Sequence, residues 1–510
     1  MHAMRAFVVV CTAHALIAPP VRLRERTAPR ATSGDYLAGL GQSTIEEVDA
    51  VVIGCGPAGL AAAVELKRRG FDRVVALERR EAPDEFEVAK AYLYLVDRRG
   101  QRWTDAVGAT DGIRARGVSN EGFSLTRIYP DEKGIFPTKP VLARPGAAQA
   151  VWIPRASLLA ALAERAAHDG ADLRFGVSVD GLRAADDGAV DIACGATTLR
   201  TPLVVGADGA RSRVRDFLAK ELPASSFEPR ELASPSAGLT YKMLQVPPSF
   251  DVTNKTDGSS FTTRSRDAYT VPSRSTKPNT RRLRLGLLPS RDPELPRTAN
   301  IIRPANHEIW GCATGAEVRE FLRSEFPQLP DAVVSDEACE AFAIAEPGAF
   351  PSPQYVETVA ATVGAARCFL VGDAIHAFPP DLGQGVNAAL EDVKTLGDVL
   401  DDQNAVAAYQ AARAPAAKAI AHLVQRGFPY QYDQSVWRQR LFTVGLVGRV
   451  AANALAAKLL PEKIAKRVAP PPAAFSVIDG EDYVGVWKHI KRATRATAAL
   501  AVAVLARAVI

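Results

Sequence analysis

Glycines with a spacing that suits phosphate binding lie in Gly54-Cys55-Gly56-Pro57-Ala58-Gly59. The spacing GxGxxG lets the backbone turn tightly, approach a pyrophosphate and bring a helix against a strand. The exposed N–H groups and the dipole of that helix then hold the diphosphate. Glu78 follows nineteen residues after Gly59, where a carboxylate can accept hydrogen bonds from an adenosine ribose. These residues indicate dinucleotide binding.

Two later segments favour FAD over NAD as that dinucleotide. The first is a strand, an acidic turn and a basic helix start, with Gly206-Ala207-Asp208-Gly209 at its centre. The second is a strand that ends in Gly372-Asp373 and is followed by Gly383-Gln384-Gly385-Val386-Asn387. A second GxGxxG, which a separate nicotinamide-binding fold would need, does not occur in the sequence.

In this order, the three segments resemble the fingerprints of the single-component flavoprotein aromatic hydroxylases, the para-hydroxybenzoate hydroxylase group. The match covers roughly residues 47–413. The resemblance implies that Asp373 hydrogen-bonds the ribitol or pyrophosphate, that Asp208 influences flavin and nicotinamide binding, and that Arg155 lies near the phosphates. It also implies that N–H groups of Gly383–Asn387 face the isoalloxazine. A helix N-terminus there would stabilise negative charge on the reduced ring.

Within that group the sequence is most similar to the kynurenine 3-monooxygenase branch. Thr240-Tyr241-Lys242-Met243-Leu244 and Gly383-Gln384-Gly385-Val386-Asn387 are similar to its motifs, and this resemblance implies that Asn387 contacts substrate. The branch's segment with a carboxylate-binding arginine is replaced by Lys90-Ala91-Tyr92-Leu93-Tyr94, which puts Lys90 in the arginine's place. The sequence therefore leaves the substrate's identity open.

The sequence thus predicts one cofactor site without a metal ligand or a catalytic side chain. His376 is expected to pack or to form hydrogen bonds rather than to catalyse. Lys90 and Asn387 are the expected substrate contacts. The expected FAD-binding residues are Gly54, Gly56, Pro57, Ala58, Gly59, Glu78, Arg79, Arg155, Asp208, Gly372, Asp373, Gly383, Gln384, Gly385, Val386 and Asn387.

The activity implied by the resemblance is monooxygenation with FAD, NADPH and molecular oxygen. A hydroperoxide on flavin carbon C4a would hydroxylate an aromatic small molecule, and the protein would exclude water and orient the ring. Two alternatives stay open: an FAD-dependent epoxidase acting on an isoprenoid or carotenoid, and a flavin-binding protein without turnover. NADH in place of NADPH is also open.

The elements that must position these residues follow from apolar patterning. Residues 47–53 and 74–77 read as buried strands on either side of a helix over 57–69, which gives a βαβ unit. A helix over 156–167, strands at 203–205 and 368–371, and a helix over 386–400 complete the framework. The predicted fold class is α/β, a Rossmann-like FAD-binding domain with an interleaved β-sheet substrate domain and C-terminal helices.

The predicted FAD-binding domain is discontinuous, with residues 46–90, 151–222 and 355–405. The substrate domain takes 91–150 and 223–354, and a helical region takes 406–510. Residues 258–282, rich in Ser, Thr, Arg and Pro, are predicted to form a mobile loop.

Composition is ordinary for a globular enzyme of 510 residues, with 47% hydrophobic and 23% charged residues. The net charge of +5, without basic blocks among aromatics, gives no indication of a nucleic-acid partner. The six cysteines form no CxxC pair, which argues against a metal ribbon and against a dithiol reductase.

Residues 1–45 read as a targeting presequence. An apolar stretch over 6–17 is followed by the arginines Arg22, Arg24, Arg26 and Arg30, a pattern typical of a two-part plastid presequence. Secretion and mitochondrial import are the alternatives. The apolar residues 496–510, which follow a basic stretch, are expected to form a docked amphipathic helix or a weak membrane-surface contact.

Overall fold

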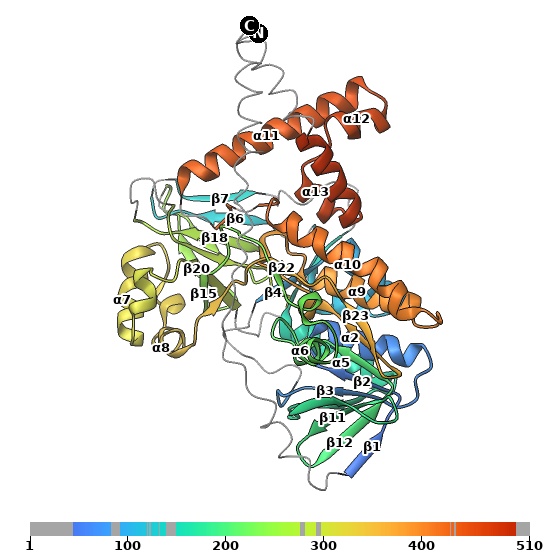
Figure 1. The fold of residues 1–510 in the computed structure, drawn as a ribbon. Helices are drawn as coiled ribbons and strands as arrows, with labels where there is room; N and C mark the ends of the chain where they lie inside the picture. The colour runs from blue at the N-terminus through green and yellow to red at the C-terminus, as the bar shows by residue number, and fades with distance from the viewer. Residues whose placement is uncertain are drawn as a thin grey trace.

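The computed structural model describes residues 44–82, 92–119, 121, 124–131, 133–138, 149–254, 256–275, 281–291, 297–428, 430–432 and 435–495. Two sheet-based bodies lie side by side, and helices from the C-terminal part rise above them (Figure 1). Residues 1–43 of the predicted presequence, Lys90 and the apolar residues 496–510 fall outside the described residues, whereas Thr44 and Ile45 belong to a described strand, Thr44–Glu47.

The first body is built on a six-stranded sheet of order β23-β24-β13-β2-β3-β9. All neighbouring strands pair in parallel except β23 and β24. The strands are β2 (Ala50–Ile53), β3 (Val74–Leu77), β9 (Asp172–Arg174), β13 (Leu203–Gly206), β23 (Ala360–Val363) and β24 (Ala366–Leu370). Because β2, β3 and β13 are buried on both faces, their sequences are continuous apolar runs.

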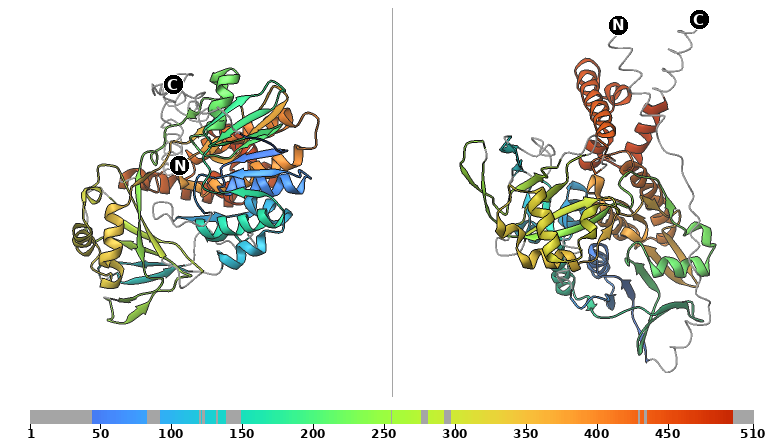
Figure 2. Two further views of the ribbon diagram at one scale, coloured as in Figure 1. Left: turned by 90° about the horizontal axis from the view of Figure 1, so that it is seen from below. Right: turned by 90° about the vertical axis from the view of Figure 1, so that its left-hand side faces the viewer.

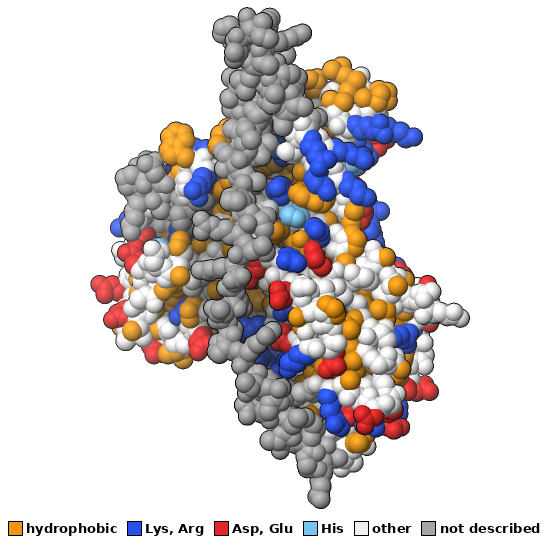
Figure 3. All heavy atoms as spheres, viewed as in Figure 1, with side chains coloured by type: hydrophobic (Ala, Val, Ile, Leu, Met, Phe, Trp, Pro, Cys, Tyr) orange, Lys and Arg blue, Asp and Glu red, His pale blue; other side chains and the backbone are white. Residues whose placement is uncertain are grey.

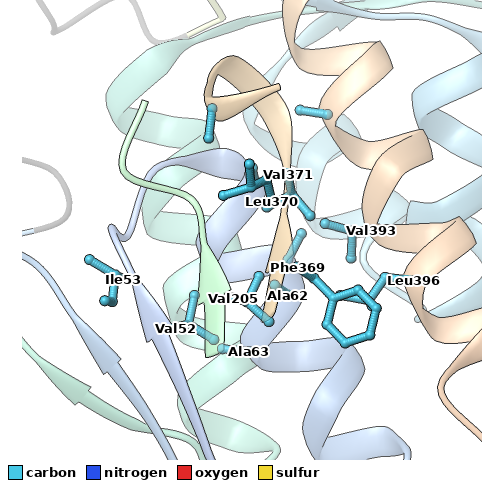
Figure 4. Packing of buried hydrophobic residues seen from close by; sticks show 14 of the residues in the cluster. Val52, Ile53, Ala62, Ala63, Val205, Phe369, Leu370, Val371, Val393 and Leu396 are labelled. Carbon is cyan, nitrogen blue, oxygen red and sulfur yellow. The ribbon is translucent and has the colours of Figure 1, made fainter. Parts of the chain in front are cut away.

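Helices cover this sheet and complete its core. They are α2 (Pro57–Arg68), α5 (Arg155–His168), α6 (Arg213–Glu221), α9 (Gly385–Val399) and α10 (Ala405–Val424). Helix α2 contacts α5, α9 and strands of the sheet. Figure 4 shows the packing, with Val52, Val205 and Phe369 from the strands facing Ala62 of α2 and Leu396 of α9.

The second body is a seven-stranded sheet of order β21-β15-β20-β19-β18-β6-β7. Its strands are β6 (Leu125–Ile128), β7 (Ile135–Thr138), β15 (Thr240–Val246), β18 (Ala268–Pro272), β19 (Arg284–Leu287), β20 (Arg297–Arg303) and β21 (Gly348–Ala349). Helices α7 (Gly315–Glu325) and α8 (Asp336–Ile344) pack beside it and share its own hydrophobic core (Figure 2).

Smaller sheets accompany the two bodies. One is β1-β12-β11-β10, from Thr44–Glu47, Thr197–Thr201, Val190–Cys194 and Gly181–Ala184. Another is β4-β8-β5, from Leu93–Val96, Val151–Pro154 and Val118–Ser119. The others are β14-β22-β25, from Arg230–Glu231, Gln354–Tyr355 and His376–Ala377, and the hairpin β16-β17, from Asp251–Thr253 and Ser260–Thr262.

Helices α3 (Arg98–Ala106) and α4 (Thr110–Arg116) follow β4. The sequence boundaries put them in the substrate domain, whereas α3 packs against α9 and α4 against α5. The cause is Trp103, which is fully buried in the core of the first body and donates to Glu65 of α2 at 3.1 Å. An aromatic residue of this size is placed by the partners that bury it.

The C-terminal helices are α11 (Val436–Leu459), α12 (Glu462–Val468) and α13 (Ala473–Ile478), followed by helical residues 483–495. Within the described part of the chain, α11 alone is long and apolar enough to cross a membrane, judged by length and composition. Most of its side chains point away from the protein, and apolar and basic residues gather on this upper part of the surface (Figure 3).

The predicted α/β fold class is confirmed, and the strands and helices of the βαβ unit lie where the sequence predicts them. One element prediction was wrong. Residues 258–282 contain β17 and β18, and β18 pairs with both β6 and β19 inside the seven-stranded sheet.

Candidate dinucleotide and substrate site

Three turns of the first body start from the same edge of its sheet. Gly206 at the end of β13 pairs in register with Ile53 at the end of β2 and with Leu370 at the end of β24. Ala207 N donates to Ile53 O at 2.9 Å, and Val371 N donates to Gly206 O at 3.0 Å. The three sequence fingerprints therefore leave adjacent strands at one level, where ligands of open α/β sheets bind.

Close packing explains the glycines of the first turn. Gly54 has φ of 98°, and a Cβ atom there would lie 2.6 Å from Ala207 O. A Cβ atom on Gly59 would lie 1.7 Å from Gly54 O, so no larger residue fits while α2 keeps its place. The turn thus aims the N-terminus of α2 along the sheet edge.

Glu78 supports this turn from the end of β3. Its carboxylate accepts hydrogen bonds from Cys55 N at 3.0 Å and from Arg80 N and Nη2, both at 3.1 Å. Burial raises the pKa of Glu78, but the bonds from Arg80 and Cys55 outweigh it and hold the pKa below its usual range. The sequence reasoning chose Arg79, which is exposed, and missed Arg80, which contacts Glu78.

Asp208 and Asp373 mark the other two turns. Asp208 Oδ2 accepts from Arg213 N at 2.6 Å and so caps α6, while its buried Oδ1 has no hydrogen-bond partner in the described structure. Burial raises the pKa of both carboxyls, and the carboxylate of Asp392 adds to the shift at Asp373 although His376 opposes it. Asp373 is nevertheless exposed, so its carboxylate is open to a ligand.

The space around these turns fits a dinucleotide. A Cβ atom on Gly56, Gly383 or Gly385 would meet no atom within 4 Å. Neither α2 nor α9 has a side-chain cap, so their first N–H groups are available to an anion. These N–H groups suit the phosphates of FAD. The unpaired Asp208 Oδ1 suits a donor on the polar ring edge of FAD.

Arg155 opens α5 beside this space. It is largely buried, and its guanidinium forms no hydrogen bond or ion pair with another described residue. Its charge opposes the rise that burial causes in the pKa of Tyr94 on β4 and of Tyr241 on β15. A guanidinium without a partner among the described residues is suited to a phosphate or a carboxylate.

For Asn387 the structure differs from the expectation of a substrate contact. Its side chain is 0% exposed. Its Oδ1 accepts from Asp97 N at 3.0 Å, and its Nδ2 donates to Leu95 O at 2.8 Å and to Gly383 O at 3.0 Å. The amide is fully occupied in holding the Gly383–Asn387 turn against β4.

Gln384 holds the same turn through two residues that the sequence did not indicate. Its Nε2 donates to Asp97 Oδ2 at 2.7 Å, and its Oε1 accepts from Tyr483 Oη at 2.8 Å. Tyr483 also stacks under the guanidinium of Arg99 at 3.6 Å. Burial raises the pKa of Asp97 to about 6, although the bond from Gln384 opposes the shift.

A buried network of charges connects the Gly372 turn to α9 and α10. Asp392 accepts from Gly372 N at 2.8 Å and from Arg413 Nε at 2.7 Å, and it pairs with His376 Nε2 at 2.9 Å. Arg413 also pairs with Glu391 at 2.9 Å. His376 therefore forms a hydrogen bond as the sequence reasoning expects, and the described contacts indicate a structural role for it.

Five aromatic side chains, all half-buried, extend from this site into the second body. The rings of Tyr92 and Tyr94 are 5.4 Å apart, those of Tyr241 and Phe350 are 5.2 Å apart, and those of Phe350 and Tyr432 are 5.6 Å apart. Burial and Tyr92 raise the pKa of Tyr241, whereas the charge of Arg155 lowers it. We call Tyr92, Tyr94, Tyr241, Phe350 and Tyr432 the aromatic wall. It can stack a planar substrate.

Sequence reasoning found the turns but missed much of what holds them. Asp97, Arg413 and Tyr483 come from three distant parts of the chain, and nothing local distinguishes them. Asp392 could have been found from the sequence, since it lies five residues after Asn387 in the same motif. Lys90, the expected substrate contact, lies outside the described residues.

Comparison with known proteins agrees with this geometry. The family model described as FAD binding domain matches residues 47–423. Kynurenine 3-monooxygenase of Salinispora tropica is 28% identical over 432 residues, which cover 81% of this chain and 85% of that protein.

Two solved structures share the fold. PqsL of Pseudomonas aeruginosa, solved in complex with 2-aminobenzoylacetate, has a TM-score of 0.53 and 22% identity, covering 78% of this chain and 99% of that one. A mutant of 2-methyl-3-hydroxypyridine-5-carboxylic acid oxygenase has a TM-score of 0.55 and 21% identity, covering 74% of this chain and 90% of that one.

Proposed function

The chain belongs to the FAD binding domain family and is an FAD-dependent monooxygenase, and from this premise we propose that it hydroxylates an aromatic small molecule with electrons from NADPH. Molecular oxygen and a small-molecule substrate are the reactants typical of the family. The observation that carries the proposal is the aromatic wall beside the three converging turns.

One set of residues would bind FAD, and another would orient the substrate. The first N–H groups of α2 and α9, with Glu78, Asp208, Asp373 and Arg155, would bind FAD. Bound FAD supplies the redox chemistry, because it accepts electrons from a nicotinamide and activates oxygen. The aromatic wall would orient the substrate ring and exclude water from the reacting centre. With one GxGxxG in the sequence, NADPH is proposed to bind transiently.

The test is substrate-dependent turnover by the purified, FAD-loaded protein. NADPH oxidation is followed with and without L-kynurenine, 2-aminobenzoylacetate and a panel of other aromatic acids, under labelled molecular oxygen. We expect at least one aromatic compound to accelerate NADPH oxidation and to gain one labelled oxygen atom, detected by mass spectrometry. The same assay with NADH in place of NADPH gives the preference between the two nucleotides.

Other outcomes separate the alternatives. Labelled epoxide formed from a carotenoid, with no aromatic compound accelerating the reaction, would identify an isoprenoid epoxidase instead. Retained FAD with no NADPH consumption in the presence of any compound would identify a flavin-binding protein without turnover. Either result would refute aromatic hydroxylation.

We also propose that α11 and α12 contact an anionic membrane surface. Trp437 is 66% and Leu459 70% exposed, and between them Leu441, Val444 and Leu455 recur at helical spacing on one face of α11. Residues 436–468 carry seven Lys or Arg side chains against one acid, Glu462. A helix with exposed apolar residues and flanking cations suits the plane of an anionic bilayer.

Co-sedimentation with vesicles tests this contact. We expect the protein to bind vesicles that contain phosphatidylserine and to bind pure phosphatidylcholine weakly. The double variant Trp437→Ser, Leu459→Ser should lose binding, while Ile344→Ser on α8, where Ile344 is 73% exposed, should keep it. Equal binding by all three proteins would refute the proposal. Plastid delivery by residues 1–45 stays a prediction, which the location of a fluorescent fusion in plant cells would test.

A further inference from the structure

Asp381 is a buried carboxylate at the entrance to the turn that faces the proposed flavin site. It lies in the 3-10 turn Pro380–Leu382, which leads directly into Gly383 and α9. Its side chain is 4% exposed. Oδ1 accepts from Ser236 Oγ at 2.8 Å and from Gln431 Nε2 at 3.2 Å, whereas Oδ2 has no hydrogen-bond partner in the described structure.

The neighbouring buried acids differ from Asp381. Asp392 is paired with Arg413 and His376, and both oxygens of Asp97 accept hydrogen bonds. Only neutral groups hold Asp381, and burial raises its pKa to about 6. A buried acceptor without a donor is destabilising, so native proteins rarely keep one without a function.

The surroundings of Asp381 are those of a binding site for a flat molecule. Tyr432 directly follows Gln431, which donates to Asp381 Oδ1, and the Asp381 carboxylate, after burial, raises the pKa of this phenol. Tyr432 belongs to the aromatic wall and continues through Phe350 to Tyr241. The Asp381 carboxylate therefore lies beside Tyr432, at one end of this row of rings. An ionised carboxylate oxygen accepts hydrogen bonds but cannot donate them.

We propose that Asp381 is a substrate-binding residue whose Oδ2 accepts a hydrogen bond from an amino group on the aromatic substrate. This inference rests on the proposed aromatic hydroxylation and narrows its substrate to amino-bearing aromatic compounds. The substrate ring lies against Tyr432 and Phe350 while its amino group satisfies the carboxylate. A ring without that group leaves Asp381 buried and unpaired, so it binds more weakly.

The experiment compares matched ligands on the FAD-loaded protein. Dissociation constants for 2-aminobenzoylacetate against benzoylacetate, and for anthranilate against benzoate, are measured from the change in flavin absorbance. We expect the wild type to prefer the amino member of each pair by about tenfold or more, as expected for a hydrogen bond to a charged group. Asp381→Asn should reduce that preference to near one.

Ser236→Ala is the matched control, because it removes a bond to Oδ1 and leaves Oδ2 in place. It should keep the preference of the wild type. If Asp381→Asn does not retain flavin, Asp381→Leu is measured in its place. It replaces the unpaired acid by an apolar side chain of similar size.

The outcomes distinguish this inference from the proposed function. If Asp381→Asn keeps the preference, or weakens both members of each pair equally, the assignment of Asp381 is wrong while aromatic hydroxylation stands. The assignment is equally wrong if only aromatics without an amino group accelerate NADPH oxidation in the wild type. If no aromatic compound binds or accelerates the reaction, the proposed function itself has failed.

Discussion

Replacing Asp392 by Asn tests whether the charged network behind the Gly372 turn holds the cofactor site together. The carboxylate is fully buried and serves Arg413, His376 and the N–H of Gly372 at once. Removing one partner of a buried ion pair costs about 3–5 kcal/mol, because the other charge stays buried without compensation. Asp392→Asn keeps the size of the side chain, so the loss is electrostatic rather than a cavity.

The expected shift in melting temperature follows from the length of the chain. An unfolding entropy of about 2 cal/mol/K per residue gives about 1 kcal/mol/K for 510 residues, so the loss corresponds to about 3–5 °C. Calorimetry of the flavin-free protein measures it. Asp401→Asn is the control, since Asp401 is 72% exposed and its ion pair with Arg69 is worth at most about 1 kcal/mol.

The same variant has a defined pH dependence. Burial raises the pKa of Asp392, but Arg413 and His376 outweigh it and hold the pKa below its usual range. A depressed carboxyl pKa contributes stability above the unfolded value of about 4, and this stability is lost as the pH falls through the folded value. Asp392→Asn should therefore lose stability less steeply in acid. If it melts within 1 °C of Asp401→Asn at pH 7, the network does not hold the turn and the reasoning fails.

Three further changes probe separate parts of the site. Burial raises the pKa of Asp381 to about 6, so the flavin-free wild type should gain stability as the pH falls from 7 through 6 towards 4. Asp381→Asn should show a smaller gain in urea unfolding, because only Asp97 keeps a pKa raised to about 6, and an unchanged pH profile would contradict the shift. Gly59→Ala should abolish FAD binding, measured by flavin absorbance, because its Cβ would overlap Gly54 O; a yellow, stoichiometric variant would disprove this packing. Tyr483→Phe removes the bond to Gln384 and should weaken FAD binding about three- to tenfold in a fluorescence titration, whereas equal affinity would show that the bond does not position the turn.

The sequence predicted the parts of the site that depend on local signals. The βαβ unit and the three turns are encoded by short apolar runs followed by glycine and aspartate, and the structure has a strand end at each of them. These signals work because a turn that brings backbone N–H groups to a phosphate needs particular residues at fixed spacing.

The sequence analysis did not predict the contacts between distant segments. Asn387 was expected to contact substrate because of the resemblance to the kynurenine 3-monooxygenase branch, but which side chains of its motif point inward depends on β4, about 290 residues earlier. Strand β18 was not predicted because the residues around it are rich in serine, arginine and proline. Its buried Tyr269 and Val271 are covered by the core of the second body, and no pattern inside residues 258–282 reveals that core.

The register of the sheet makes the cofactor site a property of the whole first body. Gly206 is in line with Ile53 and Leu370 only because β13 lies between β2 and β24, strands that are more than 300 residues apart in the chain. A one-residue slip of β24 would move Gly372 and Asp373 along the edge and turn Phe369 to the opposite face of the sheet, where Cys368 and Leu370 now pack. The buried apolar pattern of the strands therefore fixes where the three turns meet. The hydrogen bonds from Asp97, Asp392 and Tyr483 then fix how each turn faces the ligand.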